Sequence, residues 1–229
     1  MKKSLFDILS QVYGEKYLWT EVESVLKSEA PSMSPDEYLD PFKNLIIGIL
    51  SQNTSDANCT RAYIGLSKKF EIIPKVLAEA DVTEIRQSIR PGGLYNLKSK
   101  RIKKFSEAVL EKFGGDLTKL TKLPKEEARE KLFELPGIGP KTADVWLSVC
   151  GHHGVAAVDT HIERVTKRLG IVPPDAPYEQ IKEALEKIFP SGQRLRGHEL
   201  LIRLGRDYCK SRQPLCKSCP VKELCQKNI

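Results

Sequence analysis

Helical periodicity extends through almost the whole chain and limits the possible folds more than any other feature of the sequence. Apolar residues recur at the spacing of one helix face, and glycine or proline separates one such segment from the next. No stretch alternates apolar and polar residues over the length of a half-buried strand. We therefore expect an all-α fold. The expected helices cover residues 41–50, 55–70, 74–80, 82–89, 98–113, 125–134, 141–150, 160–169, 178–189 and 194–208.

Basic residues gather in two segments of the chain. Residues 86–112 carry 8 lysines and arginines against 2 acidic residues, and residues 191–229 carry 9 against 3. Such segments suit a polyanion, because each cation near a phosphate releases condensed counterions. They also suit solvated helix faces, so charge alone leaves nucleic-acid binding open.

The sequence shows no sign of a membrane segment. The apolar run at residues 42–50 is far shorter than the roughly 20 residues of a membrane helix. The first residues meet a charge too early for a signal peptide. We therefore expect a cytoplasmic protein, associated with the nucleoid if the source is prokaryotic. Because no oligomer signature is visible, we expect a monomer.

The segment Leu-Pro-Gly-Ile-Gly-Pro-Lys at residues 135–141 lies between two helical segments. Gly137 and Gly139 permit backbone angles closed to other residues and let a ligand approach the main chain. Pro140 suits a first helical position, and the amides after it are placed to hold a phosphate oxygen. Ile138 is expected to turn inward as an anchor. A Gly-x-Gly loop alone is more often a plain turn, but with Leu-Pro before it and Pro-Lys-Thr-Ala after it the segment resembles the helix-hairpin-helix of a family of DNA glycosylases.

Two residues near the starts of successive helices are candidates for catalysis. Lys141 falls in the first turn of its helix, where the helix dipole disfavours a cation and so favours the nucleophilic amine. A surface lysine that grips phosphate is an equal alternative from position alone. Asp159 follows the apolar run at residues 155–158 and would ordinarily be an N-cap. The same position keeps it ionised, which suits a residue that stabilises a cationic sugar or accepts a proton.

Four cysteines lie close together near the end of the sequence. Cys209, Cys216, Cys219 and Cys225 are separated by six, two and five residues. In a chain without a secretion signal, such a group indicates a metal site rather than disulfides. The spacing alone does not separate zinc from an iron–sulfur cluster, because both bind four thiolates.

The hairpin and the aspartate segment together resemble the endonuclease III family of DNA glycosylases. The family's Leu-Pro-Gly-x-Gly-x-Lys-Thr-Ala is present at residues 135–143, and its Val-Asp-Thr-His-Ile at residues 158–162. The resemblance implies that Lys141 is the Schiff-base nucleophile and Asp159 the catalytic carboxylate. The lysine favours the bifunctional branch, since relatives that do not cleave the strand by imine chemistry lack it.

The cysteine spacing also resembles the family's C-terminal segment. That resemblance implies a [4Fe–4S] cluster bound by Cys209, Cys216, Cys219 and Cys225. The cluster is expected to pin a loop that presents Lys210 and Arg212 to phosphates.

Two further segments resemble family loops that open the duplex. Residues 93–98 match Gly-Leu-Tyr-Asn-x-Lys, which implies that Leu94 is an apolar wedge entering the space of the flipped base. A loop leucine folded back into the core is the alternative. Residues 50–56 resemble Leu-Ser-x-Gln-x-x-Asp, but Asn53 occupies the glutamine position and Gln52 precedes it. Either amide could fill the opened helix, which leaves the lesion preference in doubt.

We expect two helical lobes with a DNA-binding cleft between them, with Lys141 and Asp159 facing each other. Residues 41–152 would form a helical barrel with the hairpin, and residues 1–40 and 153–229 a discontinuous domain with the cluster. The expected activity is a bifunctional DNA glycosylase/AP lyase of base excision repair. Its partner would be duplex DNA with an oxidised pyrimidine or an abasic site. The alternatives are a uracil/thymine mismatch glycosylase, a non-catalytic DNA-binding module and an electron carrier.

Overall fold

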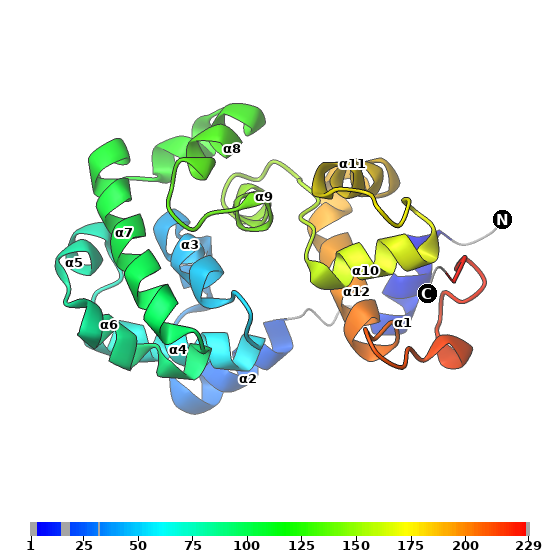
Figure 1. The fold of residues 1–229 in the computed structure, drawn as a ribbon, viewed down its shortest axis with the longest axis horizontal. Coiled ribbons are helices and arrows are strands. Elements are labelled where there is room, and N and C mark those ends of the chain that lie inside the picture. The colour runs from blue at the N-terminus through cyan, green and yellow to red at the C-terminus, as the bar shows by residue number, and fades with distance from the viewer. Residues whose placement is uncertain (1–3, 15–18, 32, 228–229) are drawn as a thin grey trace. The chain divides into compact units, whose positions relative to one another are not determined.

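The computed structural model describes residues 4–14, 19–31 and 33–227, and these residues form helices and no β-strand. The expected all-α fold is confirmed. The chain divides into two compact units, one of Met1–Leu18 with His153–Ile229 and one of Trp19–His152. Figure 1 shows their helices. In the described ranges, no helix combines the length and the apolar character that crossing a bilayer requires.

The larger unit, Trp19–His152, contains the hairpin. Its α-helices are α2 (Trp19–Glu29), α3 (Pro41–Leu50), α4 (Asp56–Lys69), α5 (Pro74–Glu79), α6 (Val82–Ser88), α7 (Tyr95–Phe113), α8 (Lys125–Phe133) and α9 (Pro140–Val149). Its 3-10 helices are η1 (Pro35–Leu39), η2 (Arg90–Gly92) and η3 (Thr118–Lys122). The long helix α7 contacts α3, α5 and α6, and Figure 1 shows α5 and α6 along one side of it.

Aromatic side chains fix the core of this unit. The rings of Phe42 on α3 and Phe105 on α7 stack with their centroids 5.4 Å apart. Trp146 on α9 is fully buried, and its Nε1 donates to the carbonyl of Pro41 at 2.8 Å. The Asp40 carboxylate begins α3 by accepting hydrogen bonds from the next free amides. The N-terminal end of α3 and the hairpin helix α9 are thereby held in one core.

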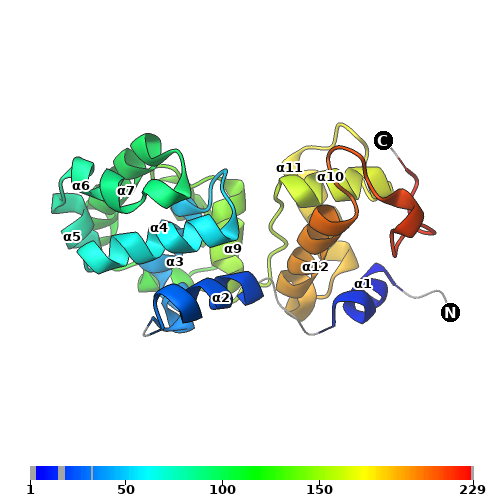
Figure 2. The same cartoon turned by 90° about the horizontal axis from the view of Figure 1, so that it is seen from below.

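Residues 19–40 belong to this larger unit, whereas the sequence led us to expect them in the cluster-bearing domain. α2 packs against α4, and both helices are visible in Figure 2. Arg61 Nε lies 2.7 Å from Glu29 Oε1, and the Tyr63 hydroxyl donates to Glu37 at 2.5 Å. These side-chain contacts join segments more than twenty-five residues apart, so local periodicity does not reveal them.

The smaller unit brings the N-terminal helix α1 (Leu5–Tyr13) together with the last part of the chain. Its other helices are α10 (Thr160–Leu169), α11 (Tyr178–Ile188), η4 (Ser191–Gln193), α12 (Arg194–Asp207) and η5 (Cys216–Ser218). α12 packs against α1 and α10 around a core that includes Leu9, Ile162 and Leu200. At the crossing with α10, a Cβ on Gly205 would meet His161 Cβ at 2.9 Å, so only glycine permits this approach.

Candidate active site and DNA-binding loops

The hairpin connects α8 to α9 through one left-handed residue. Gly137 has a φ of +83°, which favours glycine, and its Cα faces the aliphatic part of Arg101. Gly139 has an extended backbone with a φ of −106°, so of the two glycines only Gly137 adopts an angle that favours glycine. Ile138 turns inward and is 7% exposed. α9 begins at Pro140 without a side-chain cap, which leaves its first amides available for a phosphate.

Lys141 is the second residue of α9 and is partly buried. Within the described part of its own unit, its ammonium makes no hydrogen bond or ion pair. Its charge nevertheless acts on the interior, since it is one of the influences that lower the pKa of buried Cys59 against the larger rise caused by burial. A partly buried amine at a helix start, next to a hairpin, suits reaction with an electrophilic carbon.

Asp159 caps α10. Its Oδ1 accepts a hydrogen bond from the Ile162 amide at 2.8 Å, and its side chain is partly buried. Among the described residues of its own unit, no other hydrogen bond to this carboxylate is found. The capping role expected by default is therefore present, and one oxygen is left for a further partner. A cap uses only one carboxylate oxygen, so capping and catalysis are compatible.

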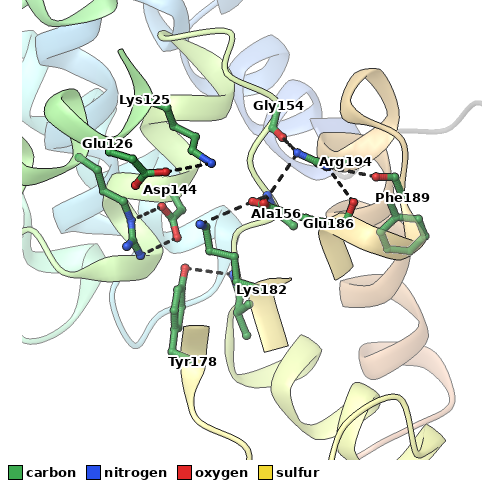
Figure 3. A network of polar contacts seen from close by, with 12 residues as sticks. Lys125, Glu126, Asp144, Gly154, Ala156, Tyr178, Lys182, Glu186, Phe189 and Arg194 are labelled. Carbon is green, nitrogen blue, oxygen red and sulfur yellow. Dashed lines mark hydrogen bonds and ion pairs between the residues drawn. The ribbon is translucent and has the colours of Figure 1, made fainter. Parts of the chain in front are cut away.

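The run before Asp159 is extended, buried and held by side chains from other elements. The Ala156 amide donates to Glu186 Oε1 at 3.2 Å, and the Val158 amide donates to the Tyr178 hydroxyl at 3.3 Å. On the other edge, His198 Nδ1 bonds the Ala157 carbonyl at 2.9 Å. Figure 3 shows the Glu186 and Tyr178 contacts. Three independent anchors therefore fix the backbone that presents Asp159.

Arg194 supports this arrangement from the start of α12. Its guanidinium donates to the Gly154 carbonyl at 2.7 Å and to the Glu186 and Phe189 carbonyls at 2.8 Å and 3.1 Å (Figure 3). It also lies 3.8 Å from the Glu186 carboxylate, which Lys182 approaches at 3.6 Å. Two cations thus hold the Glu186 carboxylate where it accepts the hydrogen bond of the Ala156 amide.

The structure distinguishes Gln52 from Asn53 in the loop after α3. Gln52 Nε2 donates to the Gly137 carbonyl at 3.2 Å, and Gln52 Oε1 accepts from Arg101 Nη1 at 2.6 Å. Asn53 is exposed and has a left-handed backbone with a φ of +53°. Gln52 is therefore engaged within the protein. Asn53, at the family's glutamine position, is the exposed amide of the two.

Leu94 lies outside the core. Its side chain is 50% exposed, so the alternative of a leucine folded back into the interior is wrong. It precedes α7 with a left-handed φ of +47°, and Gly93 before it has a φ of +65°. A non-glycine residue in this region costs about 1–3 kcal/mol and persists only where the surroundings impose it. The exposed apolar tip is what a wedge requires.

The four cysteines line one cavity. Burial raises the pKa of the Cys219 thiol, and the neighbouring Cys209, Cys225 and Cys216 add to the rise. The other lining residues include Val165, Leu169 and Val221, which make much of the wall apolar. Among the described residues, metal-binding side chains nowhere lie close enough in threes to hold a single ion as they stand.

The loop that carries the cysteines is attached to α10 through arginines. Arg168 donates to the carbonyls of Lys210 and Ser211 at 2.6 Å and 3.1 Å and lies 3.7 Å from Cys209 Sγ. The side chains of Lys210 and Arg212 themselves are exposed. The loop therefore presents two free cations on a backbone that is held in place.

Comparison with known proteins gives the family. A model described as HhH-GPD superfamily base excision DNA repair protein matches residues 46–191. The chain is 37% identical to endonuclease III of Thermotoga maritima over 190 residues, 82% of this chain and 83% of that protein. The chain belongs to the endonuclease III family. It is also 32% identical to endonuclease III of Escherichia coli K12 over 209 residues, 90% of this chain and 93% of that protein.

The solved structures of family members agree. A trapped endonuclease III–DNA covalent intermediate superimposes with a TM-score of 0.73 at 33% identity, covering 90% of this chain and 92% of that one. A thermostable thymine-DNA glycosylase has a TM-score of 0.70 at 23% identity, which shows a shared fold. The family membership and the helix-hairpin-helix fold expected from the sequence are confirmed.

Proposed function

We propose that this endonuclease III family member is a bifunctional DNA glycosylase/AP lyase that acts on oxidised pyrimidines, with Lys141 as nucleophile and Asp159 as carboxylate. The observation that carries the proposal is the position of Lys141. Its amine lies in the first turn of α9, directly after the glycine hairpin, and has no partner in the described part of its unit. A lysine used only for structure would be paired, as Lys103 and Lys112 are.

The chemistry requires an amine and a carboxylate at the same sugar. Asp159 accepts the proton that Lys141 loses, and the Nζ lone pair forms a bond to C1′ of the deoxyribose. The bond from C1′ to the base breaks, and the base leaves with the electron pair and takes up a proton. The Asp159 carboxylate stabilises the positive charge that develops on the sugar.

Strand cleavage follows from the imine. Opening of the sugar ring gives a protonated imine between Nζ and C1′, which makes the C2′ hydrogen acidic. Loss of that proton moves an electron pair into the C2′–C3′ bond, and the 3′ phosphate leaves with the C3′–O electrons. Water then hydrolyses the imine and restores the Lys141 amine.

The residues at the C-terminal cavity fit a [4Fe–4S] cluster. The four thiols that line this largely apolar cavity match the four ligands that the cluster requires. Arg168 holds the loop that carries them through its hydrogen bond to the Lys210 carbonyl. When bound, the cluster would supply structural cross-linking of this loop. Lys210 and Arg212 then meet the phosphates of the duplex, while Leu94 and Asn53 occupy the space that the flipped base leaves. We place this reaction in the cytoplasm, at the nucleoid if the source is prokaryotic.

Borohydride trapping tests the proposal. Wild type and Lys141→Ala are incubated with duplexes that contain thymine glycol, an abasic site or a guanine mismatch. We expect a covalent adduct of wild type with the thymine-glycol and abasic duplexes and none for the variant. Base release without an adduct would overturn the lyase assignment and point to a monofunctional mismatch glycosylase. Binding with neither product would point to a non-catalytic DNA-binding protein.

A further inference from the structure

Lys98 is the most deeply buried cation of the larger unit in the described residues, and its partners are unusual. Its side chain is 1% exposed, and Nζ donates to the carbonyls of Leu50 at 2.7 Å and Gly92 at 2.8 Å. Burial lowers its pKa. A buried ammonium is costly unless it is bonded, so both carbonyls are held by strong, charge-assisted hydrogen bonds.

The two carbonyls belong to the two loops that carry the candidate duplex-opening residues. Leu50 ends α3, immediately before the loop with Asn53. Gly92 ends η2, two residues before Leu94. Asn53 and Leu94 both have left-handed backbones, a conformation that asparagine tolerates but leucine rarely adopts. One ammonium therefore fixes the spacing between the two loops.

Arg101, one turn further along α7, extends this arrangement to the hairpin. It donates to Gln52 at 2.6 Å, and Gln52 donates to the Gly137 carbonyl at 3.2 Å. A Cβ built on Gly137 would lie 3.4 Å from Arg101 Cδ, so the hairpin also packs on the arginine's aliphatic stem. Lys98 and Arg101 on one helix thus hold three loops that are far apart in the sequence.

We propose that Lys98 and Arg101 form a brace that sets the Asn53 loop, the Leu94 loop and the hairpin in the geometry of the opened duplex before DNA binds. The inference rests on the proposed glycosylase/lyase function. It assigns both residues a positioning role in base extrusion, since neither needs to touch the reacting atoms. Loops that are ordered before binding lose less conformational entropy when DNA binds. More of the binding free energy then remains to offset the cost of unstacking the flipped base.

Lys103 provides a matched control on the same helix. Its Nζ also donates to two carbonyls, those of Ala78 at 2.8 Å and Ala80 at 2.9 Å. These carbonyls lie at the C-terminal end of α5, which is none of the three loops. Lys103→Met and Lys98→Met therefore remove the same kind of contact, but only the second releases the brace.

The experiment compares two single-turnover rates for each variant. One is base release from a thymine-glycol duplex, which needs extrusion of a base. The other is borohydride trapping on an abasic-site duplex, which does not. We expect the ratio of the first rate to the second to fall about tenfold in Lys98→Met and Arg101→Met, as for the loss of a charge-assisted bond. In Lys103→Met the ratio should match wild type, and Arg101→Lys should recover most of it.

The outcomes separate the brace from the underlying function. If wild type traps no abasic site, the glycosylase/lyase proposal itself fails. If wild type traps normally but Lys98→Met and Lys103→Met give the same ratio, the brace is refuted and the function stands. If circular dichroism shows that Lys98→Met is unfolded, Arg101→Met becomes the test, because Arg101 is only half-buried. A wild-type ratio of base release to trapping in Arg101→Met would also refute the brace.

Discussion

Arg129 and Asp144 form a two-pronged ion pair that joins the two helices of the hairpin. Arg129 Nε lies 2.8 Å from Asp144 Oδ1, and Nη2 lies 3.1 Å from Oδ2. Arg129 is on α8, and Asp144 is fully buried on α9, one turn after Lys141. A carboxylate removed from water in this way depends on its guanidinium partner. The pair therefore fixes α9, and with it the amine, relative to α8.

Removing the arginine alone should be more damaging than removing the whole pair. We expect Arg129→Met to lower the free energy of unfolding by about 3–4 kcal/mol, because it removes the guanidinium that pairs with a fully buried carboxylate. The double variant Arg129→Met with Asp144→Leu should recover at least half of that loss. Urea denaturation followed by circular dichroism measures both. Equal losses in the single and double variants would contradict the role given to the pair.

The two functions of Asp159 can be separated by substitution. Asparagine caps helices as well as aspartate does, so Asp159→Asn should keep the bond to the Ile162 amide and unfold at nearly the wild-type urea concentration. Without its charge, the rate of base release should fall roughly 100-fold or more. Asp159→Ala should lose about 1 kcal/mol of stability as well. Normal base release by Asp159→Asn would show that Asp159 acts only as a helix cap and has no catalytic role.

The sequence predicted elements and local motifs well because both depend on neighbouring residues. Pro140 at the start of α9 and the inward turn of Ile138 follow from local backbone chemistry, and both are observed. The role of Lys98 was not predictable. Its spacing from Ile102 and Phe105 places it on the buried face of α7, but the sequence does not show which groups it meets there, and its Leu50 partner lies 48 residues away. A basic segment looks the same whether its lysines are solvated or bonded to distant carbonyls.

Contacts between residues far apart in the sequence also explain why the structure was needed to assign the role of Gln52 and the domain of residues 19–40. Two adjacent amides in one loop are equivalent in sequence, and only the approach of Arg101 and the hairpin engages one of them. The grouping of residues 19–40 depends on side-chain contacts with α4. Tertiary contacts decide such cases, and their residues are far apart along the chain.

Replacement of Leu94 should affect function and stability differently. Leu94→Gly relieves the left-handed backbone but adds freedom to the unfolded chain, so the free energy of unfolding should stay within about 1 kcal/mol of wild type. Base release from a thymine-glycol duplex should nevertheless fall about tenfold, since the wedge is gone. Leu97→Ala is the control, because Leu97 is similarly exposed at 45%. Equal losses in both variants would contradict a specific wedge at residue 94.

The iron content of cysteine variants should divide the six cysteines into cluster ligands and non-ligands. Cys216→Ala should lose most of the roughly four iron atoms per chain expected for the cluster, together with its visible absorbance. Cys150→Ala should retain them, because Cys150 is buried on α9's C-terminal end and lies outside the cavity. Iron analysis of the purified variants measures this directly. Full iron in Cys216→Ala would exclude that residue as a ligand.

Once the cluster is removed, the rate of thiol modification should distinguish the same two groups of cysteines. Burial raises the pKa of Cys59 and of Cys150 to about 12, so neither forms the reactive thiolate between pH 7 and 9. The four cysteines at the cavity are only partly buried. After oxidative iron removal with a chelator at pH 8, a disulfide reagent should therefore modify Cys209, Cys216 and Cys225 in the folded protein, and Cys219 more slowly because its pKa is raised. Cys59 and Cys150 should react only when urea unfolds the larger unit. Rapid reaction of all six thiols without urea would show that the interior around α3, α4 and α9 opens readily. That result would contradict the ordered core that the proposed brace requires.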